Sequence, residues 1–229
     1  MKKIVLILSL VLLLSGQFFL PRYTAHELEK SLADEITAYQ ELTVEVATFP
    51  ALELLWGRAD RIEVRGREIL VDRLELDTLR AEFSDLKLVE RKGEWEVVEG
   101  VNESLYLLLS EESLNDYLAT KEELALFKRF KLDLTPQQVI LKGVLSLFNA
   151  EVTLQLTGNF KLIEDEEIIF VSDQLAVENF LVSTSSVEQL KDKLQFSLDL
   201  SNLALPLEVR KIKLKSDCLE ILGPKEENN

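Results

Sequence analysis

The sequence predicts an α+β fold dominated by a bent antiparallel sheet. Three observations lead to this prediction. Long stretches alternate apolar and polar residues, the apolar set changes face within single stretches, and helical periodicity is confined to three segments. No repeat with a fixed period is visible, which argues against a propeller or a solenoid.

Residues 151–163 alternate most regularly. The apolar side chains that share one face of this predicted strand are Val152, Leu154, Leu156, Phe160 and Leu162. The opposite face is polar. An apolar strand face must be buried against helices, a second sheet or a ligand, and a filled interior requires the same residue types as a hollow one.

Two further stretches change face as they run. The apolar positions between residues 71 and 90 are first even, then odd, then even again: Leu74 and Leu76, then Leu79, Ala81 and Phe83, then Leu86 and Leu88. A slip of one residue exchanges the two faces of a strand, so we expect bulges or turns in an extended ribbon. Residues 205–222 behave similarly, with a turn expected at Ser216 and Asp217 before a last strand.

Three segments follow the helical period. The first, at about 25–39, carries one apolar face and opens with a capping box that starts at Thr24. The second, at about 111–130, contains another capping box, starting at Thr120, that could divide it. The third is short, at about 186–195.

The N-terminus has the pattern of an export signal. Lys2 and Lys3 precede an apolar run that ends at Leu20. The run is close to the shortest length that crosses a bilayer and offers no well-placed small residues for cleavage, which favours an uncleaved signal-anchor over a cleaved signal peptide. The lysines would then stay inside, and the rest of the chain would be extracytoplasmic.

The composition fits one globular domain. The chain has 229 residues, of which 47% are hydrophobic, and shows no Ser/Gly-rich or Pro-rich linker. We therefore divide it into residues 1–20 as signal-anchor or signal peptide, residues 21–223 as a single domain, and residues 224–229 as a polar tail.

The formal charge of -15 argues against two kinds of partner. Nucleic acid and anionic membrane surfaces are both bound through clustered Lys and Arg, which this chain lacks. One cysteine and one histidine leave no intramolecular disulfide and no Cys/His metal cluster. We expect neither a metal nor another cofactor.

No motif of a common enzyme class is present, and we expect a protein that is not an enzyme. His26 lies in the first turn of a predicted helix and is interpreted as a surface residue. Cys218 is interpreted as inert because the neighbouring Asp217 raises a thiol pKa. The acidic residues at 164–167 lack the spacing of a calcium loop and indicate a solvated turn.

The segment 46–64, VATFPALELLWGRADRIEV, begins and ends like a strand but concentrates apolar residues in its middle. Pro50 suits the first turn of a short helix and Gly57 its end, which predicts a helix at 50–56.

Three residues of this short helix, Leu52, Leu55 and Trp56, would share a face, with Phe49 just before it. One interpretation is a plug that closes one end of the core. The other is a lip through which lipid enters, or a tip that touches a membrane. The indole of Trp56 suits an interface because it has an apolar body and a polar N–H.

Taken in order, these features resemble the LmeA-like phospholipid-binding family over about residues 20–223. The ordered set is an apolar segment ending in Leu20-Pro21, an amphipathic helix, a strand, the stretch FPALELLWGRADRIEV at 49–64, an extended ribbon, and DLSNLALPLEVRKIKL at 199–214. The Phe-Pro with the Leu-rich turn and Gly-Arg is the most specific piece.

The resemblance implies a fold related to the tubular lipid-binding (TULIP-like) proteins. In that fold a strongly curved antiparallel sheet wraps around an amphipathic helix and encloses an apolar groove. It also implies extracytoplasmic binding, and possible transfer, of a phospholipid or a related membrane lipid of the bacterial envelope. The candidate lipid-binding residues are Phe49, Leu52, Leu55, Trp56, Leu154, Leu156 and Phe160.

Two questions stay open at this point. Arg58, Arg61 and Arg65 could serve an anionic head group, although the acidic balance offers no evident cationic pocket. The alternative to lipid binding is a non-enzymatic envelope scaffold with a packed core that binds another protein.

Overall fold

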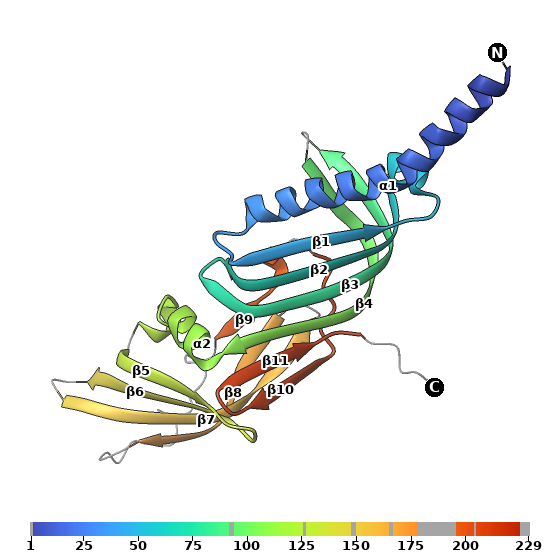
Figure 1. The fold of residues 1–229 in the computed structure, drawn as a ribbon. Coiled ribbons are helices and arrows are strands. Elements are labelled where there is room, and N and C mark those ends of the chain that lie inside the picture. Colours follow the sequence, from blue (N-terminus) through green and yellow to red (C-terminus); the bar gives the residue numbers. More distant parts are fainter. Residues whose placement is uncertain are drawn as a thin grey trace, which may run out of the picture.

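The computed structural model describes residues 2–91, 94–125, 127–147, 150–164, 167–177, 196–203 and 205–224. One long helix and two antiparallel sheets account for most of them (Figure 1). Their apolar side chains form one continuous core cluster that draws on both sheets.

The first sheet has six strands, all antiparallel to their neighbours. In spatial order they are β1 (Glu41–Ala47), β2 (Arg58–Val71), β3 (Leu74–Arg91), β4 (Glu94–Ser110), β11 (Cys218–Leu222) and β10 (Lys211–Lys215). The C-terminal hairpin of β10 and β11 thus completes a sheet that was begun by the N-terminal half of the chain.

The second sheet has five strands and is also antiparallel. In spatial order they are β5 (Phe127–Leu134), β6 (Val139–Leu147), β7 (Ala150–Glu164), β8 (Glu167–Val177) and β9 (Ser197–Asp199). The regular alternation of residues 151–163 predicted β7 correctly, because Val152, Leu154, Leu156 and Phe160 are all buried.

The first sheet curls around the helix α1 (Lys2–Glu35). In Figure 1 this helix runs alongside β1, and the far ends of β3 and β4 rise behind it. Contacts from α1 to both β1 and β4 agree with that arrangement. The prediction of a curved antiparallel sheet around a helix is therefore confirmed at this level.

The curl is produced where β3 and β4 lose register. Shifts occur between Glu82 and Phe83 and on both sides of Lys87, and Asp85 has a φ of 50°. Bulges bend a strand and increase its twist. The changes of face predicted between residues 71 and 90 are therefore confirmed, since every apolar position named there is buried.

The prediction of a helix at 25–39 is wrong at both ends. The helix already begins at Lys2, so Thr24 is buried in its interior and does not cap it. It ends at Glu35, because Thr37 donates its N–H to the Leu70 carbonyl and the chain turns into a bridge with β2. Tyr39 is consequently exposed and does not lie on the helical face.

Pro21 lies inside α1. Proline removes one backbone hydrogen bond from a helix interior and commonly bends it. Figure 1 shows that α1 changes direction along its length, with its N-terminal part leading away from the sheets. Among the residues that the structure describes, no helix is long and apolar enough to cross a membrane.

The prediction of a helix at 111–130 holds only for its first part. Helix α2 spans Glu111–Leu118, a short 3-10 helix η2 spans Glu122–Leu124, and from Phe127 onward the chain forms β5. Pairing with β6 overrides the helical spacing of the phenylalanines in this region. Thr120 does not cap a new helix, since its hydroxyl donates to the Tyr117 carbonyl.

Of the remaining expected elements, one is described by the structure and two are not fully covered by it. The C-terminal turn is confirmed, with Asp217 at a φ of 63° between β10 and β11. The expected helix at 186–195 lies outside the described residues, as do residues 165 and 166 of the acidic turn.

Candidate lipid-binding cavity

A cavity of about 330 Å³ lies between the C-terminal half of α1 and the concave face of the first sheet. Its apolar walls come from the helix, from four strands and from the segment before β10: Leu28, Leu32, Val44, Ile62, Val64, Phe83, Trp95, Val97, Leu205 and Pro206. The sheet therefore does not close fully onto the helix that it surrounds.

Strand pairing explains why these walls meet. Val44 of β1 lies opposite Val64 of β2, and Ile62 of β2 lies opposite Phe83 of β3. Residues directly opposite each other in an antiparallel pair point to the same face, so these rows form a continuous apolar floor. Leu28 and Leu32 of α1 are one helical turn apart and cover that floor from above.

The polar side chains at the cavity are Ser31, Glu35 and Glu96. Ser31 and Glu35 are one turn apart on α1, whereas Glu96 comes from β4 and forms an ion pair with Arg91 at 3.3 Å. The rim of the cavity is therefore acidic, and it offers hydrogen-bond acceptors to a group that enters from outside.

Asn102 is the polar exception in the wall of the first sheet. It lies directly opposite Phe83 and is buried, and its amide atoms find no hydrogen-bond partner within the described part of the chain. Burying an unpaired amide costs about 1–3 kcal/mol. Because protein atoms enclose this side chain, it is not among the groups that a ligand in the cavity would meet.

None of the seven residues predicted to bind lipid lines this cavity. Four of them, Phe49, Leu52, Leu55 and Trp56, belong to the connection between β1 and β2. Phe49, Leu55 and Trp56 expose 80%, 62% and 72% of their surface, and Leu52 is partly buried.

The helix in that connection is η1 (Ala51–Trp56), a 3-10 helix that ends at Gly57 with a φ of 70°. Side chains three residues apart eclipse each other in such a helix. Ala51 and Leu54 therefore form the buried row, and Leu54, not Trp56, plugs the core. The shared face expected for Leu52, Leu55 and Trp56 assumed an α-helix, which explains the difference.

The other three predicted residues, Leu154, Leu156 and Phe160, lie on β7 in the second sheet. They are buried in a packed interior, where the Phe160 ring meets the rings of Phe170 and Phe196. The structure thus places the two predicted groups in separate parts of the molecule.

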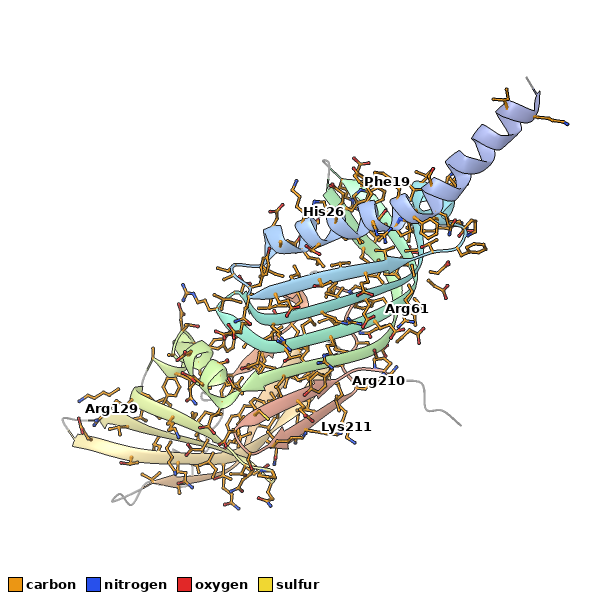
Figure 2. All side chains as sticks on the ribbon, in the orientation of Figure 1. Phe19, His26, Arg61, Arg129, Arg210 and Lys211 are labelled. Carbon is orange, nitrogen blue, oxygen red and sulfur yellow. The ribbon has the colours of Figure 1, made fainter. Side chains whose placement is uncertain are left out.

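The three arginines considered for a head group do not line the cavity either. Arg61 and Arg65 lie on the side of β2 opposite its buried residues, and both are ion-paired, Arg61 with Glu82 at 2.9 Å and Arg65 with Glu63 at 2.7 Å (Figure 2). Arg58 is also exposed.

A larger open hollow, of about 890 Å³, lies over β2–β4 and the C-terminal strands. It carries charges of both signs, with Glu63, Arg80 and Glu82 alternating with the buried residues of β2 and β3. This hollow is therefore on the outer side of the first sheet, and its charged walls are unsuited to acyl chains.

Trp95 and Val97 are among the cavity residues that were not singled out from the sequence. They belong to β4 and stand two residues apart, the spacing of one strand face, so alternation could have identified them. Alternation does not predict that β4 passes behind the helix, because that path depends on the bulges.

Cys218 is partly buried beside the ion pair of Lys215 and Glu220. Burial raises the pKa of its thiol, with a smaller contribution from Glu220. The interpretation of this residue as inert agrees with that direction, although burial, and not Asp217, is the main cause.

Comparison with known proteins supports lipid binding in general. Residues 16–223 match the family described as LmeA-like phospholipid-binding. No match to a curated protein or to a solved structure was found. Because the family match covers nearly the whole chain, the protein belongs to the LmeA-like phospholipid-binding family.

Proposed function

We propose that the protein binds a phospholipid by taking acyl-chain methylenes into the cavity between α1 and the first sheet. The observation that carries this proposal is an apolar cavity, walled by Leu28, Ile62 and Phe83, in a member of a phospholipid-binding family. Each methylene transferred from water to such walls contributes about 0.8 kcal/mol.

The size of the cavity limits what it holds. A volume of about 330 Å³ is at the lower end of the range of small-molecule pockets. We therefore propose that acyl chain fills the cavity, while the head group stays at the acidic rim.

The rim supports a preference among head groups. Glu35 and Glu96 place two carboxylates where the head group would lie, and Arg91 pairs with Glu96, which leaves a net excess of one negative charge there. Like charges repel, so an anionic head group is disfavoured, and a head group that carries an ammonium group gains a charge-assisted hydrogen bond.

The place of action is a further part of the proposal. Lys2, Lys3 and the apolar run that ends at Leu20 support export of the chain, with the lipid-binding part outside the cytoplasm. N-terminal sequencing of the mature protein, together with protease accessibility in intact cells, tests both the export and the retention of this segment. Movement of lipid between membranes would follow if the bound lipid exchanges.

The two tryptophans of the chain permit a direct test of lipid binding. Trp95 lines the cavity, whereas Trp56 is exposed and does not line it. In the full-length Trp56→Phe variant, Trp95 is the sole tryptophan. A phospholipid with brominated acyl chains, supplied below its vesicle-forming concentration, should quench its fluorescence.

The matched variants are Ser31→Phe and His26→Phe, which add the same ring to the same helix. Ser31 lines the cavity, whereas His26 is exposed on α1 (Figure 2). Ser31→Phe should lower the lipid affinity measured from this quenching by roughly tenfold, because the ring takes up cavity volume. His26→Phe should leave the affinity unchanged. An unquenched Trp95 at saturating lipid would contradict the proposal and favour the scaffold with a packed core.

A further inference from the structure

The most exposed large apolar side chains of the described residues are not scattered over the surface. Apart from Ile4, which is also on α1, the five with the largest exposed fractions lie in two short segments: Phe18, Phe19, Phe49, Leu55 and Trp56, each between 62% and 80% exposed. We call these five residues the apolar collar.

The two segments of the collar are joined by the side chain of Gln17. Its Nε2 donates to the Thr48 carbonyl at 3.3 Å, and its Oε1 accepts the Ala51 N–H at 2.9 Å. Phe18 and Phe19 follow Gln17 on α1, and Phe49 lies between the two bonded residues of the connection. The collar residues from the helix and from the connection are therefore held at one level along α1.

The connection is also fastened to the first sheet. Phe49 donates its N–H to Asp60 Oδ2 at 2.8 Å, and the Asp60 N–H is donated to Thr48 Oγ1 at 3.2 Å. Ala51 and Leu54 are buried beneath the connection. The exposed rings are thus displayed by an ordered frame that holds them in water at a free-energy cost, which is typical of a binding surface.

The position of the collar indicates what covers it. Toward the N-terminus it is continuous with the apolar run that begins at Ile4, so a bilayer is an environment in which both would be buried together. Trp, Phe and Leu form the apolar faces of segments that lie in the interfacial layer of a membrane. The collar has this composition, and the Tyr23 ring stacks on Phe19 at 6.1 Å on the side toward the sheets.

The distribution of charge also favours contact between the collar and a membrane. With a formal charge of -15, the chain gains nothing from general electrostatic adsorption to an anionic membrane. Arg22 and Arg58, both exposed, come three residues after Phe19 and two residues after Trp56 in the sequence. Contact with lipid is thus favoured at the collar and disfavoured elsewhere on the acidic surface.

We propose that the apolar collar is a membrane-contact surface, which inserts into the interfacial layer of a phospholipid bilayer and seats the protein on it at the level of Gln17. This contact is separate from the cavity, whose walls contain no collar residue. In this contact the connection between β1 and β2 touches lipid together with the N-terminal segment.

The test uses the full-length Trp95→Phe variant, in which Trp56 is the sole tryptophan, mixed with phosphatidylcholine vesicles whose acyl chains are brominated at shallow or deep positions. Trp56 emission should shift to the blue and fall by roughly half, more with shallow than with deep bromines. The control chain carries Trp56→Phe, Trp95→Phe and Tyr39→Trp, which moves the reporter to an exposed position just beyond the C-terminal end of α1, and it should stay unquenched.

A second pair of variants measures the contribution of the collar to binding. Phe49→Ser with Leu55→Ser should lower vesicle partitioning by roughly tenfold, while urea unfolding is unchanged because both side chains are exposed. Val101→Ser with Ile163→Ser removes exposed apolar side chains elsewhere and should leave partitioning unchanged.

Three results would overturn the proposal. The first is that the protein floats with vesicles while Trp56 stays unquenched, and the second is that it does not bind vesicles at all. The third is that Trp56 emission shifts to the blue when the protein concentration rises without lipid, which would indicate that a second copy covers the collar. Quenching of Trp95 by lipid below its vesicle-forming concentration reports on the cavity independently of all three.

Discussion

The two sheets bury their apolar faces in different ways. The first sheet curls around α1 and leaves a cavity of about 330 Å³ between them. The second sheet fills its interior with aromatic rings: Phe170 and Phe196 stack at 5.1 Å, and Phe160 meets both edge-on at 6.2 and 6.1 Å. Both sheets present apolar and polar residues in alternation, β7 of the second sheet more regularly than β3 of the first.

The difference teaches that alternation determines which face is apolar but not whether that face is filled. A helix is a straight or kinked rod, and a strongly curved sheet does not stay in contact with it along its whole length. Rings from neighbouring strands, in contrast, can interlock. The cavity follows from the pairing of a rod with a curved surface.

The largest expected effect is a difference in stability between core substitutions in the filled second sheet and in the first sheet, which borders the cavity. Phe170 is completely buried, so Phe170→Ala should lower the free energy of unfolding by about 3–5 kcal/mol. Val97→Ala, in the cavity wall, should cost at most about 1.5 kcal/mol, because the side chain already borders empty space. Urea denaturation of both variants measures this, and equal losses would remove the contrast between the sheets.

The second effect concerns the rim of the cavity, which the filled sheet lacks. Glu35→Gln together with Glu96→Gln removes two negative charges but keeps the shape of the side chains. Affinity for an anionic phospholipid should rise by roughly tenfold relative to a phospholipid with an ammonium group. Competition between the two lipids, read by Trp95 quenching, measures the ratio, and an unchanged ratio would place the head group away from this rim.

The smallest effect compares acid sensitivity in the two sheets. Glu220 on β11 accepts a hydrogen bond from Lys215 at 2.5 Å, and that bond lowers its pKa from the ordinary value of 4.5. Asp133 on β5 is paired with Lys131, which lowers its pKa from 3.8. A carboxyl whose folded pKa is lowered stabilises the fold above its unfolded pKa, and this stability is lost as the pH falls through the folded pKa.

Glu220→Gln should therefore lower the free energy of unfolding at neutral pH by about 0.5–1 kcal/mol, and Asp133→Asn by less, because the Asp133 side chain is more exposed. Both differences from the native chain should vanish at a pH well below the lowered pKa values. Thermal unfolding as a function of pH measures this. A loss that persists in acid would show that the pairs act through packing and not through charge.

Much of the fold followed from local patterns. Strand β7 and the changes of face in β3 could be predicted because the core requires one apolar face from each strand, and a change of parity requires the strand to bend or bulge to keep that face inside. The family could also be recognised, since the Phe-Pro stretch and its Leu-rich turn keep their order along the chain.

The remaining features depend on contacts between distant residues. Phe127 and Phe130 fit a helical face, yet pairing with Leu145 and Gly143 of β6 places them in a strand. Pro21 and the capping box at Thr24 suggested a new helix start, but α1 continues through both. An apolar groove was expected but its lining was assigned to other residues, because Trp95 and Val97 reach the cavity only through the bend of β4.

The unbroken course of α1 has a mechanical consequence. From Lys2 to Glu35 no loop interrupts the helix, so the N-terminal part is joined without a linker to the segment that carries Leu28 and Ser31. Pro21 lies between the two parts, where the missing hydrogen bond makes the helix easiest to bend. A reorientation of the N-terminal part is therefore passed on to the cavity wall except for what bending at Pro21 absorbs.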